Sequence, residues 1–428
     1  MESKIQAAIG MTRKWDAREA GREVARDTIQ KLDGPPNFFI LFSTIHYEEN
    51  GGFQELLNGV WDVLPKDTPL IGGTVTGFMN NYGVYSRGAT ALAVSNSNMD
   101  VIIGYGKNTK RNPKKAARQC VKMIKKSLDR SNHPNKFLLN LISASEIPDI
   151  PPLGRKKIIQ EGFIIKIIMQ LFGFSQYVLQ KGQGRDDEVI REIAKFFPDY
   201  FMLGGGTLDD GTGFTNYQFI NKDVLTNSVV TLGIKTSDNL GVFTNHNLKE
   251  TGIRFKITKS SKDGGIIHEI NGKPAASELI DLLNWPKDFL KDDTWFKTTY
   301  YFPLGFHLEN SNLLGSRVIV GIYGQSLITT LRTKDLEGSI LTTDGKSLLK
   351  TVENNLNNYS KDPKFGLFAS CSTRLITLGK EIYKARDKML DCFGEKPFIV
   401  FYVGGESTYS PNTGLVYTNT SFNSAVFW

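Results

Sequence analysis

Two adjacent glycines follow a run of apolar residues at three places in this chain, within residues 69–74, 202–207 and 403–406. Glycine has no Cβ atom, so the backbone can turn with positive φ, and a ligand or another chain segment can approach its N–H groups closely. We therefore predict three glycine turns at the ends of buried strands, each able to face a ligand. The alternative is that these glycines only make tight turns in a packed sheet.

The first two glycine pairs lie in similar surroundings. Pro65 precedes Thr74 by nine residues, and Pro198 precedes Thr207 by nine. Before each pair, stretches whose apolar residues recur at helical spacing alternate with continuous apolar runs. A strand-like run follows each pair. We predict an internal duplication of about residues 7–105 and 113–246. The expected helices are 15–32, 53–61, 114–128 and 189–197, and the expected strands are 38–42, 89–94, 137–142 and 229–234.

The C-terminal half begins with strands and then returns to the first pattern. Asn271 and Gly272 form a tight-turn dipeptide, and Pro274 is suited to begin a helix over 275–283. Further strands are predicted at 266–270, 300–306, 317–323 and 328–332. A distant third copy is predicted from helices 347–356 and 378–392 and strands 365–371 and 398–403. The fold class is therefore α/β, with layered sheets and helices, an internally duplicated N-terminal half and a mixed α+β C-terminal domain.

An apolar insertion, within residues 150–182, occurs in the second copy alone. The stretch 155–181 is rich in Ile and Phe, but Glu161, Lys166 and two glycines make it a poor bilayer span. We predict a helix over part of 158–179 that covers a pocket or packs on a partner. A membrane-surface helix is the alternative, because basic residues flank the stretch.

The composition excludes several classes of protein. A net charge of +8 is spread along the chain without a basic stripe interleaved with aromatic residues, so no nucleic-acid partner is expected. The three cysteines are too few for a disulfide framework or a zinc cluster, and the five histidines show no ligand spacing. We expect a cytoplasmic protein with no signal peptide, membrane span, metal or cofactor.

Several short motifs occur in a fixed order along nearly the whole chain. They are Gly10, Thr12, Asp16 and Ala20, then residues 70–74, 203–207, 270–275, 368–374 and 404–406, and finally Asn419 and Thr420. In this order they resemble the FIST proteins, which combine an N-terminal and a C-terminal FIST domain. The resemblance implies a FIST N-like domain over 1–246 and a FIST C-like domain over 247–428.

The same resemblance implies a function in sensing. FIST proteins are cytosolic sensory domains of signal transduction, proposed to bind small ligands such as amino acids. Many carry an output module, and none is expected here, so the signal would pass through a separate protein partner. The expectation is a binding protein for amino acids or similar small polar metabolites, with no catalytic residue.

The predicted ligand site lies mainly in the C-terminal half. Arg374 and Glu406 each follow an apolar run, where a charge is costly unless it is paired or bound to a ligand. A mutual salt bridge is the alternative. If the two runs are adjacent parallel strands, their carboxyl ends meet at one sheet edge, where open α/β sheets bind ligands. The candidate residues are Ser370, Cys371, Ser372, Arg374, Gly404, Gly405, Glu406 and Asn419, together with Gly72, Gly73, Thr74, Gly205, Gly206 and Thr207.

The second class of function is an enzyme of the acyl-transfer or hydrolytic type that uses Cys371. Such a nucleophile needs a base, and His307 is a candidate only if the fold brings it close. An enzyme should show a thiol of lowered pKa beside a base in a cleft, whereas a sensor should show a closed pocket with paired charges.

Overall fold

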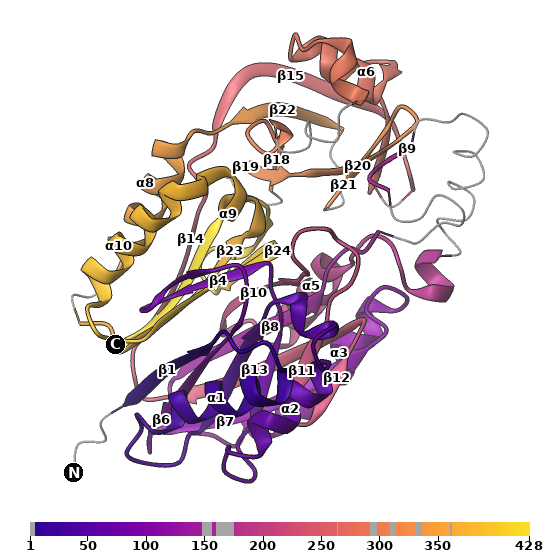
Figure 1. Ribbon diagram of the computed structural model, residues 1–428. Helices are drawn as coiled ribbons and strands as arrows, with labels where there is room; N and C mark the ends of the chain where they lie inside the picture. The colour runs from indigo at the N-terminus through magenta and orange to yellow at the C-terminus, as the bar shows by residue number, and fades with distance from the viewer. Residues whose placement is uncertain are drawn as a thin grey trace.

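A computed structural model describes residues 5–147, 156–159, 175–262, 264–291, 298–308, 314–330, 336–359 and 362–428. In these residues the strands form three mixed sheets with helices packed on them, and no sheet closes into a barrel (Figure 1). The predicted α/β fold class is confirmed. The helices are α1 (Ala17–Ile29), α2 (Phe53–Trp61), α3 (Pro113–Leu128), α5 (Asp186–Phe196), α6 (Ala275–Leu282), α8 (Gly345–Leu356), α9 (Ser372–Leu378) and α10 (Ile382–Phe393).

The first sheet has the strand order β1-β6-β2-β3-β11-β12. In the second sheet the main path runs β14-β26-β23-β24-β10-β8-β13-β7, with β25 and β4 also pairing with β24 and β5 with β4. The strands are β1 (Gln6–Thr12), β2 (Phe38–Ser43), β3 (Leu70–Thr74), β4 (Gly77–Asn80), β5 (Gly83–Tyr85), β6 (Ala89–Ser95), β7 (Met99–Lys107), β8 (Asn135–Ser143), β10 (Phe201–Thr207), β11 (Gln218–Ile220), β12 (Asp223–Leu225), β13 (Ser228–Thr236), β14 (Leu240–Asn245), β23 (Phe365–Cys371), β24 (Phe398–Ser410), β25 (Gly414–Thr418) and β26 (Phe422–Phe427).

One strand arrangement occurs three times in these two sheets. The orders β1-β6-β2-β3, β7-β13-β8-β10 and β14-β26-β23-β24 each contain one parallel pair, flanked by a strand that runs antiparallel to it. A helix precedes and another follows the first strand of each parallel pair. We call these three groups of elements units 1, 2 and 3. That the units arose as copies of one another and superpose stays a prediction.

Apolar side chains explain why the units pack together. The runs in β2, β8 and β23 are buried throughout or nearly so, as expected for strands covered on both faces. Their inner faces share one core, in which Phe42 stacks on Phe401 with ring centroids 4.4 Å apart and Phe137 meets Phe427 edge-on at 5.5 Å. The first contact joins units 1 and 3, and the second joins units 2 and 3.

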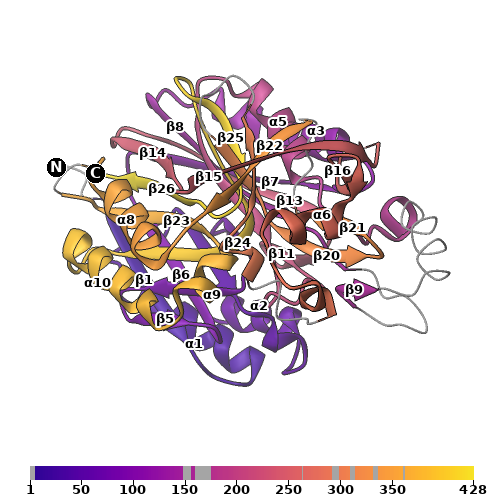
Figure 2. The same ribbon diagram turned by 90° about the horizontal axis from the view of Figure 1, so that it is seen from above.

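Helices cover the outer faces of the units. The apolar sides of α1 and α2 pack on unit 1, those of α3 and α5 on unit 2, and those of α8 and α10 on unit 3 (Figure 2). Helix α1 begins where Asp16 accepts a hydrogen bond from the Glu19 N–H at 2.9 Å, and Asp344 caps α8 in the same way. The predicted bounds of α2 match the structure, and helix α3 begins one residue earlier than predicted.

Apart from β9, which lies between β8 and α5 in the chain, the strands of the third sheet are inserted between β14 and α8 of unit 3. Its main path runs β19-β18-β22-β15-β16-β21-β20-β9, with β17 beside β16 and α6 packed on it. The Asn271 and Gly272 turn has φ of +53° and +77°, as the dipeptide predicts. The strands are β9 (Ile158–Ile159), β15 (Lys249–Ser260), β16 (Ile266–Ile270), β17 (Lys273–Pro274), β18 (Leu304–His307), β19 (Leu314–Arg317), β20 (Ile319–Tyr323), β21 (Ser326–Thr329) and β22 (Glu337–Thr342).

One prediction in this region differs from the structure, and another falls mostly on residues that the structure does not describe. The strand expected from residue 300 begins at Leu304, because the Tyr301 and Phe302 N–H groups donate to the Thr298 and Thr299 carbonyl oxygens in a helical turn. Most of the insertion lies outside the described residues, so its predicted helix is not tested there. In its described parts, β9 pairs with β20, Ser175–Leu179 forms a short π-helix, and the side chains of Tyr177, Val178 and Leu179 are about half exposed. Among the described helices, none has the length and apolar character needed to cross a membrane.

Candidate functional site

A cavity of about 120 Å³ lies where the carboxyl ends of β8, β10 and β23 meet the third sheet. Residues 144–147 follow β8, residues 208–213 follow β10, and Cys371, Ser372 and Thr373 lie where β23 passes into α9. The opposite wall comes from residues 318–330 of the third sheet. This is the edge at which open α/β sheets bind ligands, as the sequence predicts for β23.

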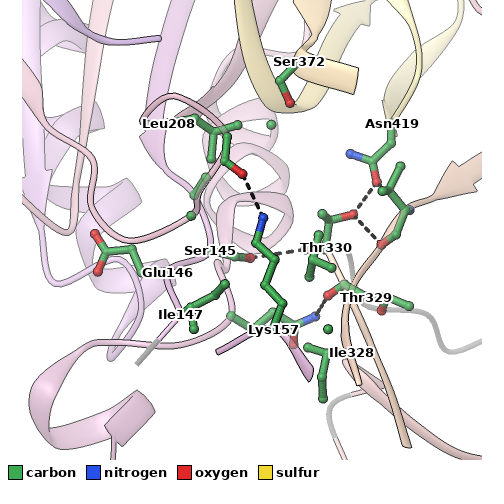
Figure 3. A pocket seen from close by; sticks show the side chains of 18 of the residues that line it. Ser145, Glu146, Ile147, Lys157, Leu208, Ile328, Thr329, Thr330, Ser372 and Asn419 are labelled. Carbon is green, nitrogen blue, oxygen red and sulfur yellow. Dashed lines mark hydrogen bonds between the residues drawn. The ribbon is translucent and has the colours of Figure 1, made fainter. Parts of the chain in front are cut away.

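Charged side chains of both signs line this cavity. Lys157, next to β9, extends into it and donates from Nζ to the Gly211 carbonyl oxygen at 3.0 Å (Figure 3). Glu146 and Asp186 supply the acidic groups, and they are only 3% and 4% exposed. The rest of the lining is mixed, with apolar side chains such as Ile147, Leu208 and Ile328 and hydroxyl groups such as Ser145 and Thr330.

Asn419 fixes one wall of the cavity. Its side-chain Oδ1 accepts from the Thr330 hydroxyl (Figure 3). The same oxygen accepts from the Val318 N–H at 3.2 Å, and the Asn419 backbone N–H donates to the Ser316 carbonyl oxygen. The next residue, Thr420, has φ of +62°, which is uncommon and costly for a β-branched residue. A chain segment from unit 3 is thus held under strain against the third sheet, at the border of the cavity.

Cys371 lies at the end of β23 and is 1% exposed. Its Sγ accepts a hydrogen bond from the Thr373 hydroxyl at 3.0 Å. Burial, with the nearby Glu406 carboxylate as a second cause, raises the pKa of this thiol well above its usual range. Among the described residues that line the cavity there is no histidine, and His307 lies at the end of β18, outside the lining.

Arg374 and Glu406 do not line the cavity, and among the described contacts the salt bridge that was considered for them is absent. Arg374 is 1% exposed and donates from Nη2 to the Leu348 carbonyl oxygen at 2.6 Å. Glu406 is fully buried, and its Oε2 accepts from the Ser421 N–H at 3.2 Å and hydroxyl at 3.0 Å. Burial raises the pKa of Glu406 to about 8. The predicted ligand clamp of Arg374 and Glu406 is therefore not formed around the cavity.

The structure separates the other predicted site residues. Cys371, Ser372, Gly404 and Asn419 line the cavity together. Ser370 lines a second, smaller space beside Arg374. Within the described lining residues of the larger cavity, the remaining predicted positions are absent, namely Gly405, Gly72, Gly73, Thr74, Gly205, Gly206 and Thr207.

The predicted glycine turns are wrong for the first two pairs. Gly72 and Gly73 lie inside β3, and Gly205 and Gly206 inside β10, all without positive φ. Each is needed because another chain segment is close: a Cβ on Gly72 would be 1.8 Å from the Leu41 carbonyl oxygen. In the third pair, Gly405 has the predicted positive φ, +75°, but Gly404 and Gly405 also lie inside a strand, β24, at an irregularity in its pairing with β10.

The threonines that follow the first two pairs belong to a buried polar network. Thr74 Oγ1 accepts from the Tyr217 N–H at 3.0 Å. Thr207 Oγ1 lies 3.0 Å from Asn216 Oδ1, and the Asn216 side-chain amide donates to Glu146 Oε1 at 3.0 Å. These residues support the acidic side of the cavity without lining it.

A buried ion cluster at the acidic side was missed from the sequence. Lys110 Nζ lies 3.2 Å from Glu146 Oε2, and both side chains are at most 1% exposed. Lys181 Nζ lies 2.7 Å from the same oxygen. Burial lowers the pKa of Lys110, although Glu146 opposes this. One signal was available, because Glu146 follows an apolar strand just as Arg374 does.

Comparison with known proteins identifies the chain. The model of the FIST N domain matches residues 37–273, which is 237 of the 428 residues. This chain belongs to the FIST family. The FIST N domain is a sensory and signalling domain, and the match does not specify a ligand. A FIST C domain, which the sequence resemblance implied for residues 247–428, is not detected.

Other comparisons add little to this assignment. Curated proteins give no match. Among solved structures, the FIST chain is similar to a cyanuric acid hydrolase from A. caulinodans, with 10% identity over 54% of this chain and 71% of that chain, at a TM-score of 0.28. That score is too low to support an argument. Within the FIST protein, the cavity is lined both by residues of the matched region, such as Glu146, and by later residues, such as Cys371.

Proposed function

We propose that this FIST protein is a sensor that binds a small polar metabolite of the amino-acid type in the cavity beside Cys371. Binding would be read out by a separate signalling protein. The observation that carries the proposal is a cavity of about 120 Å³ at the carboxyl ends of parallel strands, with cationic and acidic side chains in its lining. Ligand sites of this kind are concave and mostly apolar, with a few placed polar groups.

The charges suggest how an amino acid would be recognised. Its carboxylate would be matched by Lys157, and its ammonium group by Asp186 or Glu146. Ser372 and Asn419 could orient it through hydrogen bonds, and the apolar lining would accept the side chain. Because the lining spans the FIST N region, the third sheet and unit 3, a bound ligand would join these parts, which is one way to change a surface seen by a partner.

Binding is favoured here over catalysis by Cys371. A buried thiol with a raised pKa is a poor nucleophile, because the thiolate is the reactive form. No histidine is present among the described lining residues to act as its base. A ligand-binding experiment can separate the two functions, since a sensor releases its ligand unchanged and an enzyme converts it to a product.

The test is a thermal-shift screen of the purified protein against the amino acids and other small zwitterions. We expect at least one to raise Tm, because a ligand at 100 times its Kd stabilises by about 2.7 kcal/mol. Ser372→Trp should abolish this rise by filling the cavity. The matched control is Ser97→Trp in an exposed turn, which should respond as the parent does.

Mass spectrometry of the hit after incubation completes the test. We expect the compound to be recovered intact and Cys371 to carry no adduct. Recovery of a product, or of an acylated Cys371, would show that the protein is an enzyme and not only a sensor. If no small zwitterion stabilises the protein, or if Ser372→Trp responds as the parent does, the proposed ligand class or the proposed cavity is wrong.

A further inference from the structure

Among the residues that the structure describes, Arg374 is a buried cation without an anionic partner. Its side chain is 1% exposed, and its one hydrogen bond goes from Nη2 to the Leu348 carbonyl oxygen. Nη1 is buried and has no hydrogen-bond partner. Within the described part of the chain, no carboxylate oxygen lies within 4.0 Å of its guanidinium nitrogens. Removing a charge from water is costly unless an opposite charge and hydrogen bonds compensate it.

A second unpartnered donor lies in the same place. Ser370 is 1% exposed, and its Oγ is also buried without a partner in the described structure. Both residues line a small space of about 10 Å³ on the outer side of unit 3, beneath α8, α9 and α10. Tyr402 of β24 lines it as well, and Phe422 lies beneath the guanidinium, 5.7 Å from ring centroid to Cζ. The other lining residues are Met79, Val352, Leu378, Ile382, Ala385 and Met389.

We propose that this space binds a single monatomic anion, for which chloride is the natural candidate, between Arg374 and Ser370. The guanidinium Nη1 and the Ser370 hydroxyl would donate to it, and the Tyr402 hydroxyl could supply a third donor. The site is separate from the larger cavity, and it does not depend on the proposed sensing function.

Size and charge select this ligand. The space of about 10 Å³ is at the lower limit for one water-sized particle, so a halide ion would enter with a small outward shift of the lining side chains, whereas phosphate, sulfate and carboxylate ligands are far too large. A water molecule could satisfy the two donors but would leave the guanidinium charge uncompensated. Glu406 is the carboxyl group whose charge would act on Arg374, yet it lies beyond ion-pair distance, and burial raises its pKa so that much of it is protonated at neutral pH.

Anion occupancy would also fix the position of α9. Arg374 belongs to this short helix, and the residues just before it, Ser372 and Thr373, line the larger cavity on the other side of the strand. Ser370 and Cys371 are consecutive in β23, so they face opposite sides of the sheet. The anion would therefore hold the strand and helix that form one wall of the larger cavity.

The direct test is a crystal structure of the full chain soaked in sodium bromide, measured at the bromine absorption edge. We expect an anomalous peak within hydrogen-bond distance of Arg374 Nη1 and Ser370 Oγ. An ordered water without anomalous signal at that place would overturn the proposal.

Solution measurements show whether binding occurs outside the crystal. At constant ionic strength, which removes differences in screening, replacing gluconate by about 200 mM chloride should raise Tm by about 2 °C. Ser370→Ala should reduce the rise, and Arg374→Met should abolish it. The matched control is Arg386→Met, because Arg386 also donates to a backbone oxygen, that of Asn81, but lies outside this space. A Tm independent of chloride in the parent would mean binding at crystal concentration only and would refute a physiological site.

Discussion

Glu146→Gln is expected to lower the free energy of unfolding by about 3 to 5 kcal/mol, which is the cost of leaving a buried charge uncompensated. The charge left behind is that of Lys110, whose side chain is fully buried and whose ion-pair partner within 4.0 Å is Glu146. Urea unfolding followed by circular dichroism measures the change. A smaller loss of unfolding free energy is expected for Lys110→Met, because Glu146 would still be paired with Lys181 and hydrogen-bonded to the Asn216 amide.

The double variant Lys110→Met with Glu146→Gln distinguishes pairing from packing. If the ion pair is the cause, the double variant should be more stable than Glu146→Gln alone, because the buried charge of Lys110 is removed together with its partner. The surface pair of Lys125 and Asp129 serves as the control, since both side chains are about half exposed. Asp129→Asn should cost less than about 1 kcal/mol. Equal losses for the buried and exposed pairs would contradict this account.

The sequence predicted most of the secondary structure because the signals are local. Spacing of apolar residues at three and four positions gave the helices α1, α2, α3, α5, α8 and α10, and continuous apolar runs gave the buried strands. The order of these elements also pointed to the repeated strand arrangement. The strand at residue 300 was misplaced because apolar and aromatic residues there fit a short helical turn as well as a strand.

The glycine pairs were recognised correctly as special positions, but for an incomplete reason. A sequence shows that a Cβ atom is absent, not which neighbour occupies its place. Gly72 and Gly206 lie within strands where a carbonyl oxygen of the next strand, from Leu41 and Gly404 respectively, would clash with a side chain. Only the register of the sheets reveals this, because the two segments are far apart in the chain.

The candidate site was predicted in part. The carboxyl end of β23 was expected to face a ligand, and Cys371, Ser372, Gly404 and Asn419 do line the cavity. The opposite wall was not foreseen, because Lys157 and Thr330 come from segments whose meeting depends on the third sheet. Arg374 was assigned to the wrong side of the sheet. It lies in the first turn of a helix, so the alternation of side chains along a strand does not predict where its side chain points.

Glu406→Gln is expected to remove a loss of stability that the parent shows between about pH 4.5 and pH 8. The pKa of Glu406 is raised by burial from 4.5 to about 8 in the folded protein. In that range the folded state therefore holds one proton more than the unfolded state, so the parent loses about 1.4 kcal/mol per pH unit as the pH rises. The stabilising effect of the proton is complete below about pH 4.5 and is lost above pH 8.

The measured quantity is the difference in unfolding free energy between parent and variant at a series of pH values, because groups that titrate equally in both cancel. The glutamine side chain of the variant would keep an oxygen for the two bonds from Ser421 and would place an amide where Glu406 Oε1 now lacks a partner. The variant should therefore gain on the parent by about 5 kcal/mol across the range. Thr408→Val in the same strand changes no ionisable group, so the difference between this variant and the parent should show no such trend. A pH-independent difference for Glu406→Gln would mean that the carboxylate stays ionised, in which case it would offset the charge of Arg374 from a distance and weaken the case for a bound anion.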